Sequence, residues 1–265
     1  MNFFQILYAE IERKIVLMKR YPYQYFLNLV IIMILLFSSV SPLLKDTKDF
    51  SIVDAFIGFM MWNVTLSVMQ QMGWQIQSES QLGTLENVII ASGNIAKVLV
   101  ARSLESLLES IVVILCEALV ISWLFSVPLT DWGTLLSVNI IVIFLISAAG
   151  MYGFGMILAG IGLILKRIGA IAEVLNYVFL LFTGAFFPIE NSPHFLQLIG
   201  KSIPLTLGID LMRKINNQDM PVFSSKYINE FAMLLIQSVF YMLVGFIIFE
   251  LMLYIAKKKG ILGLH

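Results

Sequence analysis

Six long apolar stretches recur along the chain, separated by short polar segments. They cover residues 23–40, 53–75, 98–125, 135–165, 168–187 and 231–256. A helix needs about 20 apolar residues to cross the hydrocarbon layer, where it satisfies its own backbone hydrogen bonds. The pattern therefore predicts an all-α membrane protein with six transmembrane helices.

The residues before the first apolar stretch have a different, amphipathic pattern. Apolar positions recur there at steps of three and four at Phe4, Leu7, Ile11, Ile15 and Met18, opposite Glu10, Arg13, Lys14 and Arg20. Such a pattern is typical of a helix that lies in the membrane interface. We expect an interfacial helix over residues 1–21 with its basic side toward the headgroups, and a turn into the first span at Pro22.

Connecting segments with more Lys and Arg residues alternate along the chain with segments that have fewer. Eleven Lys and Arg residues fall in the segments that we place inside, among them Lys257, Lys258 and Lys259, and six fall outside. Cytoplasmic segments carry the excess of positive charge, so this bias predicts a multi-pass cell-membrane protein with both termini in the cytoplasm. Residues 188–230 then form an extracytoplasmic loop, apolar enough to dip back into the membrane as short half-helices.

Composition excludes several classes of function. The chain of 265 residues is 59% hydrophobic and 13% charged, with a net charge of zero, which gives no basic field for nucleic acid. The two histidines, His194 and His265, are far apart, so no metal site is expected. The "GKS" at Gly200 lacks the glycine that a phosphate-binding loop needs five residues earlier, where Phe195 stands. We therefore expect a single membrane domain over residues 1–265 that is not an enzyme.

Polar residues lie inside the second and fifth apolar stretches at helical spacing. The second contains Asn63, Ser67, Gln70, Gln71 and Trp74, and the fifth contains Glu173, Asn176, Tyr177, Thr183 and Gly184. Polar groups at membrane depth face a partner helix or an aqueous path. For the second stretch, hydrogen bonding between helices and the wall of a transport route both stay open. For the fifth stretch, the wall of a route and a dimer seam both stay open.

The third stretch carries charged residues, and the fourth is rich in small residues. Arg102, Glu105 and Glu109 share one helical face near the cytoplasmic interface, while Glu117 falls at hydrocarbon depth. Glu117 is either a buried hydrogen-bonding group or a contact for a proton or substrate. The fourth stretch is rich in small residues, with pairs four apart at Ala149/Gly153 and Gly155/Ala159. Such pairs allow close contact between helices.

The polar segment "SESQLGTLENVIIASG" between the second and third stretches predicts a short helix. Gly83 breaks the incoming helix, Thr84 is suited to cap a new one, and Glu86 lies in its first turn, where an acid is favourable. Gly93 is suited to end it. The helix would lie on the cytoplasmic surface, either inserted into a groove of a soluble partner or resting on lipid headgroups.

Two segments carry a resemblance to a known family. "ESQLGTLENVIIASG" resembles the cytoplasmic coupling segment of the permease subunits of type-two ABC exporters, the ABC-2 type transporter family. "LLFTGAFFPIENSPHFLQLIGKSIPLTLGIDLMR" resembles the closing signature of that family, here with Gly184, Phe187, Pro188, Pro193, Pro204 and Arg213. The order of the two motifs and the six spans extend the resemblance over the whole chain, although Ser92 stands where the family often has a proline.

The resemblance implies a division of labour between polypeptides. Two permease subunits, identical or different, form the membrane part of an exporter, and separate cytoplasmic ABC ATPase subunits bind the ATP and magnesium. The residues that would contact the ATPase are Glu79, Leu82, Gly83, Thr84, Leu85, Glu86 and Asn87. Those that would flank the substrate path are Asn63, Ser67, Gln70, Gln71, Trp74, Glu173, Asn176, Tyr177 and Phe187. The closing signature would form the outer exit loop.

The substrate and two other classes of function remain open at this point. Family members of this kind, expected in bacteria, export drugs, antimicrobial peptides, lipids, or lipid-linked polysaccharide and teichoic acid. Polysaccharide exporters often have an asparagine where this chain has Ile203, which favours a drug, peptide or lipid-like substrate. The alternatives are an ion-coupled transporter or channel, supported by Glu117 and Glu173, and a membrane scaffold without transport.

Overall fold

A computed structural model describes residues 2–46, 52–165, 167–186, 189, 193–218, 224 and 226–260, without the side chains of residues 38–46, 66, 70, 129–131 and 218. All regular structure in the described ranges is helical. The elements in chain order are α1 (Phe3–Arg20), α2 (Pro22–Asp46), α3 (Ile52–Gln81), α4 (Leu85–Ser92), α5 (Ile95–Phe125), the 3-10 helix η1 (Leu129–Leu136), α6 (Val138–Leu165), α7 (Gly169–Phe182), α8 (His194–Lys201), α9 (Pro204–Gln218) and α10 (Ile228–Lys258).

The predicted helical membrane class is confirmed, with four to six candidate spans in the described residues. The helices α3, α5, α6 and α10 are each long and apolar enough to cross a membrane. Two bent pairs pass the same test when each is taken together: α1 with α2, bent by 90°, and α8 with α9, bent by 98°. The second helix of each pair begins at a proline, Pro22 or Pro204, as predicted for Pro22. Proline suits a first helical position because the N–H that it lacks has no partner there.

The predicted fifth span was too long. In its place, α7 has only 14 residues, about 21 Å at 1.5 Å per residue, against a hydrocarbon layer of about 30 Å. The helix ends because Gly184 adopts a φ of +76°, a left-handed conformation that glycine adopts at little cost. The Thr183 hydroxyl donates to the carbonyl of Phe179 at 2.5 Å in the last turn. The predicted site residues Phe187 and Pro188 lie outside the described residues.

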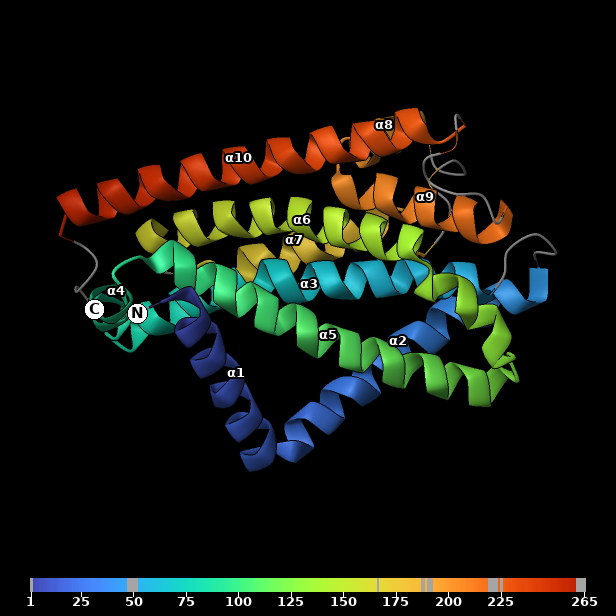
Figure 1. Ribbon diagram of the computed structural model, residues 1–265, viewed down its shortest axis with the longest axis horizontal. Helices are drawn as coiled ribbons and strands as arrows, with labels where there is room; N and C mark the ends of the chain where they lie inside the picture. Colours follow the sequence, from blue (N-terminus) through green and yellow to red (C-terminus); the bar gives the residue numbers. More distant parts are fainter. Residues whose placement is uncertain are drawn as a thin grey trace.

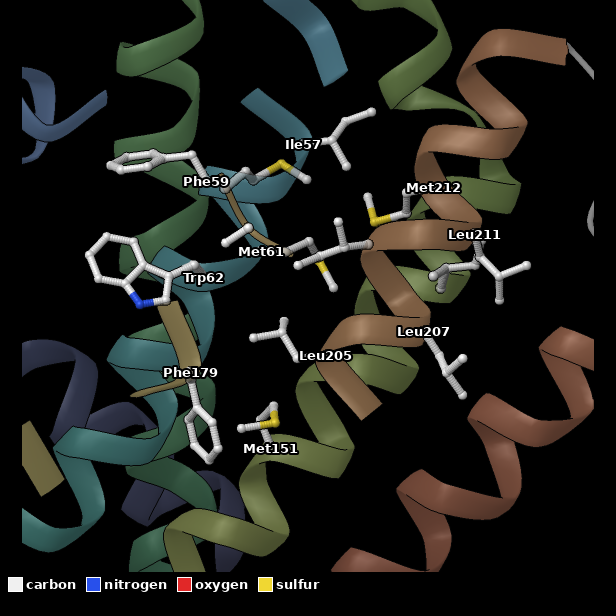
Figure 2. Close-up of a cluster of buried hydrophobic side chains, with 14 of the residues drawn as sticks. Ile57, Phe59, Met61, Trp62, Met151, Phe179, Leu205, Leu207, Leu211 and Met212 are labelled. Carbon is white, nitrogen blue, oxygen red and sulfur yellow. The ribbon is translucent and has the colours of Figure 1, made fainter. Parts of the chain in front are cut away.

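The helix α3 is the centre of the bundle and is buried along almost its whole apolar length. Its residues Ile57, Phe59, Met61 and Trp62 pack against side chains of α6, α7 and α9 (Figure 2). The helices α3, α6, α7 and α9, which polar segments separate in the sequence, therefore pack their apolar faces into one core.

Close packing of α6 is the second feature of the core, and it confirms the prediction from the small residues. A Cβ on Gly153 would lie 2.2 Å from the carbonyl oxygen of Tyr241, and one on Gly245 would lie 2.2 Å from that of Gly153. The backbones of α6 and α10 are therefore in direct contact. On another side of α6, Gly155 admits the side chain of Met72 from α3.

The two ends of the bundle carry different elements (Figure 1). One end gathers α4, the start of α1 and the end of α10, which are elements that the charge bias predicts for the cytoplasmic side. The other end holds α9 and η1. The fold thus separates the predicted cytoplasmic segments from the helices that precede the last span.

Candidate functional site

The short helix α4 forms between the ends of α3 and α5. The chain leaves α3 at Gln81, turns at Gly83 with a φ of +67°, and ends α4 at Gly93 with a φ of +70°, as predicted for both glycines. The predicted cap at Thr84 was wrong. The Thr84 hydroxyl donates backward to the carbonyl of Glu79 at 3.4 Å, so it stabilises the exit from α3 rather than the start of α4.

One face of α4 anchors it, and the other is free for contact. Leu85 is 1% exposed and belongs to a core cluster with residues of α3, α5, α6 and α10. In contrast, Leu82 is 74% exposed, Ile90 is 79% exposed, and Glu86 and Asn87 are exposed as well. The anchored helix therefore presents an acid, an amide and the large apolar side chain of Ile90 at one end of the bundle, beside the exposed Leu82 of the preceding turn.

A buried guanidinium joins three helices beside α4. The Arg102 side chain of α5 is 7% exposed; its Nε lies 2.9 Å from Glu10 Oε1 of α1, and its Nη2 lies 2.5 Å from Glu79 Oε1 of α3. Glu79 is in the last turn of α3, three residues before the turn into α4. Arg102 therefore holds α1, the end of α3 and the start of α5 together.

The ion pairs continue along the contact between α1 and α5. Lys14 Nζ lies 2.5 Å from Glu109 Oε2 and 3.8 Å from Glu105 Oε1. Burial lowers the pKa of Lys14, but the hydrogen bond and charge of Glu109 and the charge of Glu105 outweigh it, so the pKa rises above 10.5. Lys14 is thus a cation at neutral pH. The predicted orientation of α1, with its basic side toward headgroups, was wrong at Lys14, because this side chain faces the acids of α5.

The predicted polar residues of α3 divide between two environments. Asn63 is buried, and its Nδ2 donates to Glu117 Oε1 of α5 at 3.2 Å. Ser67 is half-buried and donates to the Asn63 carbonyl at 3.1 Å, within its own helix. Gln71 is half-buried and Trp74 is 48% exposed, while no side chain is described for Gln70. Hydrogen bonding between helices is therefore the interpretation that holds for Asn63.

The predicted residues of α7 divide in the same way. Asn176 is buried, and its backbone carbonyl, not its side chain, accepts a hydrogen bond from Trp62 Nε1 at 3.3 Å. Glu173 and Tyr177 are exposed. The indole of Trp74 lies against the start of α7, where a Cβ on Gly169 would approach it to 3.2 Å. The exposed Trp74 of α3 therefore contacts the first turn of α7, the helix that carries the exposed Glu173 and Tyr177.

Arg213 is the residue of the closing signature that contacts other parts of the bundle. Its guanidinium is buried and donates to three backbone carbonyls, those of Asp54 at 2.9 Å, Gly184 at 2.8 Å and Ala185 at 3.0 Å. Two predicted signature residues, Gly184 and Arg213, are therefore partners that fix α9 against α3 and the end of α7. Pro204 begins α9 and Pro193 precedes α8. The partner Asp54 was not singled out from the sequence, because a carbonyl acceptor leaves no side-chain signal.

Replacing Asn63 with leucine is expected to destabilise the fold, because the buried Glu117 carboxyl loses the described donor at its Oε1. Leaving a buried polar group unsatisfied costs about 1–3 kcal/mol. The thermal unfolding midpoint of the purified protein in detergent measures this loss. A Ser67→Ala control should stay close to wild type, and an unchanged midpoint for Asn63→Leu would contradict the described hydrogen bond.

The described helices define an all-helical, multi-pass membrane protein. A model of the family described as ABC-2 type transporter matches residues 5–216, so the chain belongs to that family. It is the membrane permease subunit of an ABC-2 type transporter, and ATP binding lies on a separate ATPase domain with which permeases of this family pair. No curated protein matches the chain.

Proposed function

We propose that the chain is the permease of an ATP-driven exporter and that α4 is the helix on which the ATPase docks. The observation that carries the proposal is the anchored helix α4 with Glu86, Asn87 and Ile90 exposed on it. An exposed amphipathic helix fits the groove of a soluble partner. Both termini and α4 face the cytoplasm in this proposal, in line with the charge bias of the connecting segments.

The connections of α4 support a mechanism of coupling. Its two ends lead through single glycine turns at Gly83 and Gly93 into α3 and α5. A displacement of α4 by the ATPase therefore acts directly on α3, the central helix, and on α5. The ion pairs of Arg102 with Glu10 and Glu79 extend this displacement to α1. ATP-driven closure of the ATPase subunits would then rock the bundle between inward and outward access.

A second permease, identical or different, completes the transport route in this proposal. The exposed Trp74, Glu173 and Tyr177, with the half-buried Ser67 and Gln71, are the predicted path residues with described accessible surface, and we assign them to the wall of the route. Asn63 and Asn176 support this wall from within the bundle. The mixture of aromatic, acidic and amide groups suits an amphipathic substrate, so we propose a drug, an antimicrobial peptide or a lipid-like molecule, moved outward.

Replacing Glu86 with arginine is expected to weaken the complex between the permease and its ATPase, because it reverses the exposed charge of α4. Loss of one charged interfacial pair costs about 2–5 kcal/mol when the pair is desolvated, so the ATPase should no longer co-purify in gentle detergent. Quantitative mass spectrometry of the purified permease measures the bound ATPase.

The matched control is Glu173→Arg, which reverses an exposed acid on α7 and should leave the ATPase bound. Equal recovery of the ATPase with Glu86→Arg and wild type would sink the assignment of α4. Loss of the ATPase in both variants would point to a general effect of charge rather than to α4.

A further inference from the structure

The start of α7 is capped by a residue of another helix. Ile168 is the N-cap residue of α7, and its side chain has no oxygen that could accept a hydrogen bond from the first turn. Most helices receive such a bond from a Ser, Thr, Asp or Asn at this position. Here Oε1 of Gln77 in α3 accepts hydrogen bonds from the backbone N–H groups of Ile168 at 2.7 Å and Gly169 at 2.8 Å. The start of α7 therefore depends on a side chain of α3.

Apolar contacts at the same place hold α7 against α3. The side chain of Ile168 is fully buried. A Cβ on Gly73 of α3 or on Gly162 of α6 would lie 3.3 Å from its Cγ2, so Ile168 packs where both helices lack a side chain. The Gln77 amide and the Ile168 side chain together fix the start of α7 to the last turns of α3.

The rest of α7 is bound to α3 as well. Near its middle, the backbone carbonyl of Asn176 accepts a hydrogen bond from Trp62 of α3. Beyond its end, Arg213 donates to the carbonyls of Gly184 and of Asp54, the latter in the first turn of α3. Among the described elements α7 packs chiefly against α3, although only a short connection separates it from α6 in the chain. The helices α3 and α7 are thus tied together at both ends and in the middle.

We propose that Gln77 is a positioning residue that transmits the movement of α4 to α7. Gln77 lies in the last two turns of α3, just before the chain turns at Gly83 into α4. A displacement of α4 moves this end of α3, and the Gln77 amide carries the start of α7 with it. Because α7 bears Glu173 and Tyr177, the movement reaches the wall of the transport route. The inference rests on the proposed docking of the ATPase at α4 and adds the connection from there to the route.

The movement of α7 relative to α10 is the quantity to measure. Spin labels are attached at the exposed positions Val174→Cys on α7 and Tyr254→Cys on α10, after the single cysteine, Cys116, is replaced by serine. The permease is placed in phosphatidylcholine nanodiscs with the ATPase that co-purifies with it. The distance between the labels is measured without nucleotide and with ATP and vanadate. A second pair, Ser78→Cys with Tyr254→Cys, reports on the end of α3.

Replacing Gln77 with methionine removes the acceptor oxygen and keeps the length of the side chain. We expect ATP and vanadate to change the α3 distance as in the wild type, but to change the α7 distance by less than half as much. Gln77→Glu should restore the change at α7, since it keeps an oxygen and its negative charge is favourable at a helix N-terminus. Gln77→Asn, which is one methylene shorter, takes the place of Gln77→Met if that protein fails to fold.

Gln237 of α10 provides the matched control. It is half-buried, as Gln77 is, and its Nε2 donates to the carbonyl of Lys201 at the end of α8 at 2.9 Å. Gln237→Met therefore removes the same kind of hydrogen bond, between a side chain and a distant backbone, and should leave both distance changes as in the wild type. A cap that only stabilises α7 would lower the unfolding midpoint of Gln77→Met and leave both distance changes intact.

The outcomes separate this inference from the proposed function. A wild-type change at α7 in Gln77→Met and Gln77→Asn, an equal loss at α3 and α7, a loss in Gln237→Met, or no recovery in Gln77→Glu would each overturn the role of Gln77. If the α3 distance still changes in those cases, coupling through α4 stands without Gln77. If ATP and vanadate do not change the α3 distance even in the wild type, the proposed coupling through α4 itself fails.

Discussion

Replacing Arg102 with leucine is expected to cause a large loss of stability. Arg102 pairs with Glu10 and Glu79, which are both nearly buried, so its removal takes one of two cations from Glu10 and the described cation from Glu79. Breaking a buried ion pair by removing one partner costs about 3–5 kcal/mol. Because 1 kcal/mol moves the unfolding midpoint by about 2–4 °C in proteins of 150–250 residues, the midpoint in detergent should fall by at least about 6 °C.

Two further variants test the reason for this loss. Arg13 also pairs with Glu10, but its side chain is 44% exposed, and an exposed pair contributes about 1 kcal/mol or less. Arg13→Leu should therefore change the midpoint little. Glu10 keeps Arg13 when Arg102 is lost, whereas Glu79 has no other described cation, so adding Glu79→Leu to Arg102→Leu should restore part of the stability. No recovery in this double variant would contradict the described network.

Replacing Gly153 with leucine is expected to separate α6 from α10. A Cβ at this position would lie 2.2 Å from the carbonyl oxygen of Tyr241, and a backbone atom cannot move aside as a flexible side chain can. Overpacking a well-packed core costs about 1–3 kcal/mol and occasionally more. With the backbones in contact, we expect about 3 kcal/mol or more, seen as a lower midpoint and a smaller yield of monodisperse protein.

The matched control is Gly133→Leu in η1, where no atom lies within 4 Å of the added Cβ. A substitution on such an open surface usually changes stability by about 0.5 kcal/mol or less. If Gly153→Leu and Gly133→Leu unfold at the same temperature, the contact of the two backbones is wrong.

Local patterns were enough to predict several elements of the fold. The turn at Pro22 and the short helix between Gly83 and Gly93 depend on neighbouring residues, and both are found in the structure. Apolar helices also occur in all six predicted stretches, although the fifth is shorter than predicted. The packing role of Gly153 was also predictable, because small residues at helical spacing have few other uses inside a membrane.

Predictions that depended on distant contacts were less successful. The end of α7 was missed, because the apolar run continues past Phe182 while the chain turns at Gly184, whose carbonyl is bound by Arg213. The predicted side-chain cap at Thr84 was wrong, because its hydroxyl donates to the carbonyl of Glu79 and caps no N–H of α4. The amphipathic pattern of α1 was read correctly as a helix, but its charged side meets α5.

The sequence by itself determined that this protein is an all-helical membrane protein, where most of its long helices lie, and which short segment stands apart from the spans. Hydrophobic length and glycine and proline positions are local properties, and local properties can be read along the chain. The tertiary structure alone decided that Asn63 pairs with Glu117, that Arg102 joins Glu10 to Glu79, and that Gln77 caps α7. These contacts join residues up to 92 positions apart, and a charged or polar side chain in the sequence does not specify which distant partner the packing of apolar faces will bring to it.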